Sequence, residues 1–128
     1  MAEQKLPTGL LMRIFDRYSQ ALRGVRPAFI RFKDGKLIKH ALRYLTEFQI
    51  EMLFVWFLSV KKEMRPTIGA ALCKEVISAF LEASHREYGF YNQLEQQMRR
   101  LAGGSTIRIT GKAKDISVAL EKFKHSIR

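Results

Sequence analysis

Apolar residues recur at every third or fourth position along most of the chain, which is the spacing of amphipathic helices. The first stripe predicts a helix that begins near Thr8, a suitable N-cap, and ends near Gly24. Further stripes predict helices over residues 67–83, residues 85–102 and residues 115–128. Their apolar positions are Leu11, Phe15, Tyr18 and Leu22 in the first stripe, and Ile68, Leu72, Val76, Phe80, Tyr91, Leu94, Met98, Leu101, Ile116, Leu120, Phe123 and Ile127 in the later ones.

The stretch over residues 46–63 is apolar on nearly every side instead of along one face. Thr46, with Gln49 three positions later, forms a capping box, which predicts that a helix begins here. A helix without a polar face has to be covered on all sides, so it is either the central helix of the fold or meets another subunit on one side. We expect a homodimer whose interface includes Phe54, Trp56 and Phe57.

Two other segments have the character of β-strands. Residues 28–40 carry Asp34-Gly35 between two β-prone runs, which predicts a hairpin with a type I′ turn. Lys33 would then face Lys36, and an anion across the ribbon would relieve their repulsion; the alternative is an exposed, solvated hairpin tip. Residues 106–110 alternate in polarity and predict a late strand.

These elements together predict an α+β fold. We expect a mostly helical core of about five helices, with a small antiparallel sheet formed by the β-hairpin and the one late strand. At 128 residues the chain has the length of one domain, so residues 1–128 are taken as a single unit.

The end of the chain carries one family resemblance. The strand over residues 106–110, Gly111 and the helix that follows resemble the closing strand and helix of a KH domain. The Gly-x-x-Gly loop with which that family clamps nucleotides is absent from the sequence, so the resemblance assigns no site residue.

Charge is distributed unevenly along this chain. There are 23 Lys and Arg against 12 Asp and Glu, a formal net charge of +11. Residues 23–43 hold seven Lys and Arg and one acid, residues 99–128 hold eight and two, and residues 44–98 are slightly acidic. Since a charge so far from zero destabilises a compact state by self-repulsion, two basic blocks of this kind indicate an anionic partner, most simply nucleic acid.

We therefore expect a non-enzymatic protein that binds the sugar-phosphate backbone of RNA or DNA through these two blocks. Contacts to phosphate carry no sequence information by themselves, so specificity for sequence should be low. Phe29 is a candidate for stacking on an unpaired base. The cations expected to contact phosphate are Arg31, Lys33, Lys36, Lys39, Arg108, Lys112 and Lys114, with Arg99, Arg100 and Lys122 extending the track.

Sequence motifs for catalysis, cofactors and metals are missing. There is no P-loop, no dinucleotide-binding glycine pattern and no nucleophile elbow, so no catalytic residue and no cofactor is expected. His40, His85 and His125 are scattered and Cys73 is the single cysteine, so no metal site is expected. The alternative function is a protein-interaction or assembly subunit that docks through the apolar helix 46–63.

Location follows from the same features. The N-terminal residues contain no apolar run typical of a signal peptide. The longest uncharged stretch, residues 52–60, is nine residues long, far below the roughly 20 needed to span a bilayer. We expect a cytoplasmic protein that does not insert into membranes.

Overall fold

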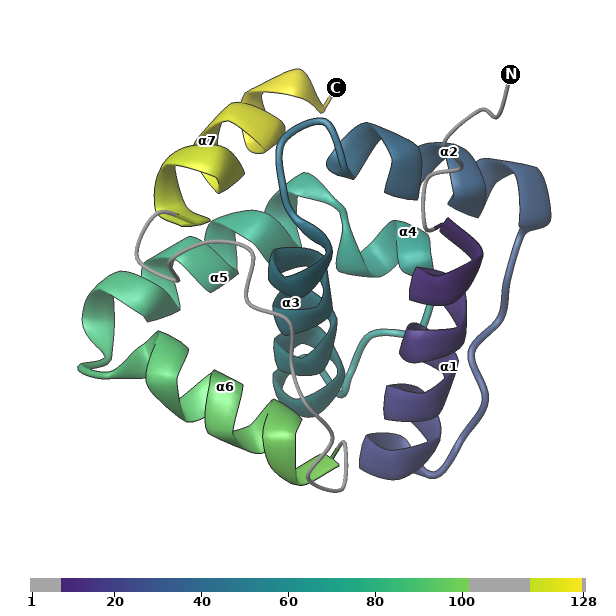
Figure 1. Ribbon diagram of the computed structural model, residues 1–128, viewed down its shortest axis with the longest axis horizontal. Coiled ribbons are helices and arrows are strands. Elements are labelled where there is room, and N and C mark those ends of the chain that lie inside the picture. Colours follow the sequence, from purple (N-terminus) through teal and green to yellow (C-terminus); the bar gives the residue numbers. More distant parts are fainter. Residues whose placement is uncertain (1–7, 102–115, 128) are drawn as a thin grey trace, which may run out of the picture.

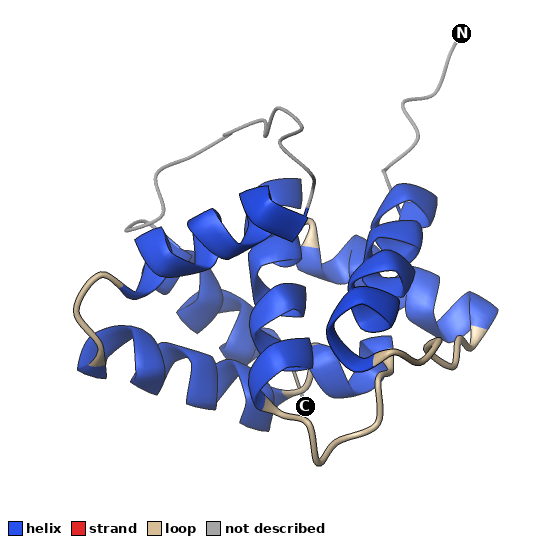
Figure 2. Ribbon diagram, turned by 90° about the horizontal axis from the view of Figure 1, so that it is seen from below, coloured by secondary structure: helices blue, strands red, loops and turns tan. Residues whose placement is uncertain are grey.

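The computed structural model describes residues 8–101 and 116–127, and the regular structure within these ranges is entirely helical (Figure 2). The predicted α+β class is therefore wrong for the described part of the chain. The late strand over residues 106–110 lies outside the described residues. The described ranges contain seven helices, where about five were predicted for the chain: α1 (Thr8–Arg23), α2 (Arg31–Ala41), α3 (Glu47–Val60), α4 (Ile68–Ala71), α5 (Lys74–Arg86), α6 (Phe90–Leu101) and α7 (Ile116–Ser126).

Helix α3 is the centre of the fold, with the other helices arranged around it (Figure 1). The predicted capping box is present: the Thr46 hydroxyl accepts from the Gln49 backbone N–H at 3.2 Å, and the Gln49 side chain accepts from Thr46 N–H at 3.1 Å. Every residue from Met52 to Leu58 is buried. The all-round apolar character of this helix is thus matched by cover from its own chain.

Residues 31–41 form helix α2 where the sequence predicted a hairpin. The Asp34 carboxylate accepts the Ile30 backbone N–H at 2.7 Å, so it satisfies one donor left free at the helix start. The positive-φ glycines of the described residues are Gly24 and Gly89, so Gly35 lacks the backbone conformation that a type I′ turn requires. The Asp34-Gly35 pair belongs to a helix here, because helical spacing places the side chains of Asp34, Ile38 and Leu45 on one side of the segment, where all three are buried.

Helix α1 ends where the sequence predicted, and its last residue also closes α3. Gly24 adopts a φ of 69°, and its N–H bonds the Gln20 carbonyl. The Arg23 guanidinium donates to the carbonyls of Phe57 at 3.2 Å, Leu58 at 2.9 Å and Lys61 at 2.7 Å, and also to that of Met64. Arg23 therefore supplies a donor to carbonyls at the end of α3 and in the turn after it, among them that of Leu58, which has no helical partner.

A second polar contact joins α1 to α3. The Tyr18 hydroxyl donates to the Glu51 carboxylate at 2.5 Å, and Tyr18 is 7% exposed. Burial, together with the adjacent Glu51 carboxylate, raises the pKa of Tyr18 well above its ordinary value. The phenol is therefore held in its neutral, donating form.

The later helices follow the predicted apolar stripes with different boundaries. The helix predicted over residues 67–83 is divided into the single turn of α4, capped by Thr67, and α5. Helix α6 begins at Phe90, after Gly89 with a φ of 71°, and not near residue 85. In α7 the predicted Ile116, Leu120 and Phe123 are buried. None of the described helices is long and apolar enough to cross a membrane.

Candidate functional site

Helix α2 and the turn after it carry two opposite stripes of residues. In each stripe, the later members lie four, seven and eleven positions after the first one. The inner stripe consists of the buried side chains of Asp34, Ile38, Ala41 and Leu45. The outer stripe, which we call the α2 stripe, consists of the exposed side chains of Phe32, Lys36, Lys39 and Arg43. At 3.6 residues per turn, positions with this spacing share one side of a helix. Phe32, Lys36 and Lys39 are thereby aligned on the solvent side, over about 10 Å at 1.5 Å per residue. The exposed Arg43 lies in the turn that follows the helix.

The stretch of chain that carries the α2 stripe exposes a single sign of charge. Asp34 is the only acid between residues 23 and 46, and it is turned inward with 3% exposure. Among the described residues, no ion pair involves a cation of the α2 stripe. Because they form no ion pair with a described residue, these cations are available to an external anion.

Helix α7 meets the end of α2 and adds to this surface. His40 Nε2 lies 2.8 Å from the Ser126 hydroxyl, and the His40 and Phe123 rings lie 5.6 Å apart. The exposed Lys122 is one turn before Ser126 and so lies on the side of α7 that faces α2. Lys33 is seven residues before His40 and so lies on the same side of α2 as His40, two turns nearer the start of the helix. Both cations flank the α2 stripe.

Arg99 and Arg100, which were predicted to extend the same track, lie at the other end of the molecule. Helix α6 packs against the second half of α3, and its end, Leu101, lies beside Arg17 of α1. Figure 1 shows the last turn of α6 near the lower end of α3, and α2 near the upper end. The length of α3, about 20 Å, separates the two. Arg99 is also paired with Glu95 at 2.7 Å.

The structure thus brings together only some of the predicted phosphate-binding residues. Lys33, Lys36, Lys39 and Lys122 share one end, while Arg108, Lys112 and Lys114 lie outside the described residues, and Arg31 is described by its helical backbone alone. Sequence reasoning missed Arg43 and Phe32 as members of this surface. The sequence did contain a signal for them, because Phe32 and Arg43 keep helical spacing with Lys36 and Lys39. The hairpin prediction instead placed Phe32 in a strand and Arg43 in the chain after the hairpin.

The predicted interface residues occupy the interior of the single chain. Phe54 and Phe57 are fully buried, and the Phe54 ring contacts Phe15 edge to face at 4.8 Å between centroids. Trp56 is 5% exposed and contacts Phe80 in the same way at 5.3 Å. Since these side chains are already covered, no observation favours docking of a partner through α3, and the homodimer stays a prediction.

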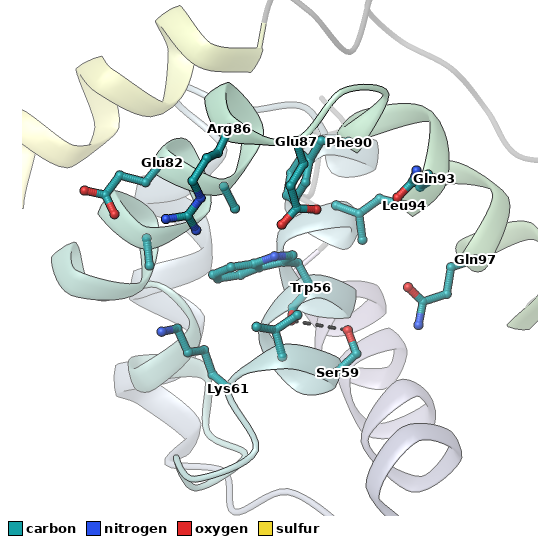
Figure 3. A pocket seen from close by; sticks show the side chains of 13 residues that line it. Trp56, Ser59, Lys61, Glu82, Arg86, Glu87, Phe90, Gln93, Leu94 and Gln97 are labelled. Carbon is teal, nitrogen blue, oxygen red and sulfur yellow. Dashed lines mark hydrogen bonds between the residues drawn. The ribbon is translucent and has the colours of Figure 1, made fainter.

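A pocket of about 380 Å³ lies between α3, α5 and α6, with Trp56 at its floor (Figure 3). Lys61 and Arg86 extend toward the indole ring from the ends of α3 and α5, and the Lys61 ammonium lies 5.9 Å from the ring centroid. Glu87 also turns toward the ring, whereas Glu82 points away from it (Figure 3). The volume of this pocket suits a small molecule. The mixture of both charge signs selects no ligand class.

Neither a metal centre nor a known relative assigns a function. No group of three or more His, Cys, Asp or Glu residues that could hold a metal ion occurs in the part of the chain that the structure describes. Comparison with models of protein families finds no match, and comparisons with curated proteins and with solved structures find none either. The function therefore has to be inferred from the surface of the molecule.

Proposed function

We propose that this protein binds nucleic acid without catalysing a reaction on it, and that the binding surface is the α2 stripe with Lys33 and Lys122 beside it. The observation that supports this most directly is the alignment of Lys36 and Lys39 on one side of α2, with Arg43 in the turn that follows the helix. All three are exposed and have no ion-pair partner among the described residues. The single acid of this stretch, Asp34, is turned away from them.

The physical basis of binding is electrostatic. Each cation that neutralises a phosphate releases a condensed counterion, so the binding constant falls steeply as salt rises. Five cations in contact with five phosphates correspond to a loss of affinity of about 500-fold between 50 and 200 mM salt. Lysine and arginine contacts to phosphate are indifferent to base sequence, so low sequence specificity follows.

The test is a charge reversal on the α2 stripe. Lys36→Glu with Lys39→Glu removes two phosphate contacts and adds two repulsive charges, while Lys and Glu have similar helix propensities. We expect the affinity for labelled RNA and DNA, measured by fluorescence anisotropy, to fall at least about 30-fold at 100 mM salt. The slope of the logarithm of the binding constant against the logarithm of salt concentration should become shallower by about two.

The matched control places the same change of charge at the other end of the molecule. Lys62 follows α3 and Arg100 lies in the last turn of α6; both are exposed, and neither has an ion pair among the described residues. Lys62→Glu with Arg100→Glu should weaken binding less than about threefold, since only long-range attraction changes. Equal losses in the two double variants would show a non-specific effect of net charge and contradict a localised site. Absence of binding by the unmodified protein at 50 mM salt would overturn the proposed function.

A further inference from the structure

Exposed apolar side chains gather where the α2 stripe begins. Phe29, Ile30 and Phe32 are all exposed, and they lie within four consecutive residues. Phe32 stands out among them at 84% exposure, and it is the only one in line with the cations of α2. Phe29, the stacking candidate of the sequence analysis, is 38% exposed and packs edge to face on Phe15 at 6.3 Å between centroids. Phe32 therefore has the freer ring face.

We infer that Phe32 stacks on an unpaired base and that the ligand of the α2 stripe is single-stranded nucleic acid. This inference rests on the proposed function and adds the class of strand to it. Lys36 lies one helical turn, about 6 Å, from Phe32, which is comparable to the distance between successive phosphates of an extended strand. A strand that follows the cations can thus place a base against the ring. In a duplex the bases are stacked on one another, so an aromatic ring beside the backbone finds no free base face.

The arrangement favours a linear polyanion over an anionic lipid surface, the other class of ligand that basic and apolar side chains attract. An interfacial helix directs a wide apolar face toward the bilayer. The apolar face of α2, with Ile38 and Ala41, is instead buried against the rest of the protein. Within the helix its solvent side offers one apolar side chain, Phe32, followed by Lys36 and Lys39 in line, with Arg43 in the turn after them. This arrangement matches a chain of phosphates with one stacked base.

The site should distinguish strand type without distinguishing sequence. The cations of the α2 stripe carry donors only, and the phenyl ring of Phe32 carries neither donor nor acceptor. Every base has a π-face that can stack, so preferences among bases should follow stacking strength alone. We expect single-stranded RNA and DNA of different sequence to bind within about tenfold of each other.

The experiment compares single-stranded and duplex oligonucleotides of the same sequence by fluorescence anisotropy, with three substitutions at Phe32. Phe32→Ala should weaken single-strand binding between about 5-fold and 100-fold, the range for loss of one stacked base. Phe32→Leu should lose nearly as much, because it keeps apolar volume but has no ring. Phe32→Trp should retain affinity for the single strand. The fluorescence of the tryptophan introduced at position 32 should be quenched by the single strand but not by the duplex.

The matched control is Tyr88→Ala. Tyr88 is fully exposed and lies between α5 and α6, away from α2, so its removal should leave affinity for every ligand unchanged. The same panel includes vesicles of phosphatidylcholine with 30% phosphatidylserine. We expect Phe32→Ala to leave vesicle binding unchanged.

Two results would overturn the inference while leaving nucleic-acid binding intact. One is a Phe32→Leu variant that binds single strands as well as the unmodified protein, which would show that no ring stacks. The other is equal affinity for single strands and duplex, unchanged by Phe32→Ala. Vesicle binding that depends on Phe32, with no binding of either kind of oligonucleotide, would overturn both this inference and the proposed function.

Discussion

Arg23 and Lys36 belong to the same basic stretch of the sequence, residues 23–43, but the structure uses their charges in opposite ways. The Arg23 guanidinium is directed inward, where it donates to four backbone carbonyls beyond the end of α1 and lies 5.3 Å from the centre of the Phe57 ring. Its burial lowers its pKa below the ordinary value, although an arginine stays protonated in any folded protein. Lys36 is exposed and has no ion pair with a described residue.

The difference teaches that a count of charges overstates what a surface offers to a ligand. Arg23 stabilises the fold, and Arg26 is paired with Asp16 at 3.2 Å. The stretch also holds Asp34, whose carboxylate supports the start of α2. The cations that remain for an external anion are the exposed ones on α2 and in the turn after it. They are fewer than the cations of the basic block over residues 23–43, but they are better aligned.

The largest expected effect comes from removing the inward charge. Arg23→Met keeps much of the side-chain length but leaves the carbonyls of Leu58, Lys61 and Met64 without their donor. Hydrogen bonds from a charged group contribute about 1.5 to 3 kcal/mol, so we expect a loss of stability of about 2 to 4 kcal/mol, measured by urea denaturation. Arg23→Lys should recover only a minor part, since an ammonium lacks the planar fork of donors.

The control for this loss is Arg26→Ala, which removes an ion pair whose arginine side chain is 77% exposed. Exposed pairs contribute little, so its stability should stay within about 0.5 kcal/mol of the unmodified protein. Similar losses in the Arg23 and Arg26 variants would refute the division into inward and outward charges.

A smaller effect tests whether α2 is a helix. The inner stripe and the α2 stripe lie on opposite sides of this segment only if it is helical. A β-carbon added to Gly35 has no heavy atom within 4 Å, and Gly35 does not have a positive φ. Gly35→Ala should therefore stabilise the protein by about 0.5 to 1 kcal/mol, as expected for the interior of a helix. In a type I′ turn the same substitution would be strained and would destabilise the protein. The sign of the change in urea midpoint decides between the two structures.

A pH-dependent effect concerns an inward-directed pair outside the basic stretch, Tyr18 and Glu51. The pKa of Tyr18 is higher in the folded protein than in the unfolded chain, whose ordinary value is 10. Its contribution to stability is therefore fully present below pH 10 and is lost as the pH rises through the folded value. Between pH 9 and pH 11, the unmodified protein should lose more stability than Tyr18→Phe does, as measured by urea denaturation. Parallel pH profiles for the two proteins would contradict the raised pKa.

Much of the helical framework was readable from the sequence because it rests on local signals. The capping box of Thr46 and Gln49 located the start of α3, and the apolar stripe of Ile116, Leu120 and Phe123 located the buried side of α7. The division near Cys73 between α4 and α5 carries no strong local signal. The sequence prediction of one continuous helix was wrong there.

The error at α2 arose from two local signals in competition. Asp-Gly between β-prone residues favours a hairpin, while Asp34, Ile38, Ala41 and Leu45 keep a helical period that extends past it. Tertiary burial decides between them, because only the helix places all four of these side chains inside. The candidate site followed the same error: its lysines were found from composition, but the alignment of Lys36 and Lys39 with Phe32 exists only on a helix.

The central position of α3 also determines how the backbone amides of the molecule exchange with solvent. Helices α1, α4, α5 and α6 all contact α3, so detaching any of them exposes apolar side chains of this helix to water. Partial opening that reaches the α3 amides is therefore almost as costly as complete unfolding. In deuterated water, the amides from Met52 to Leu58 should exchange last and as a group, at a rate set by global unfolding, whereas those of α2 can exchange by local opening.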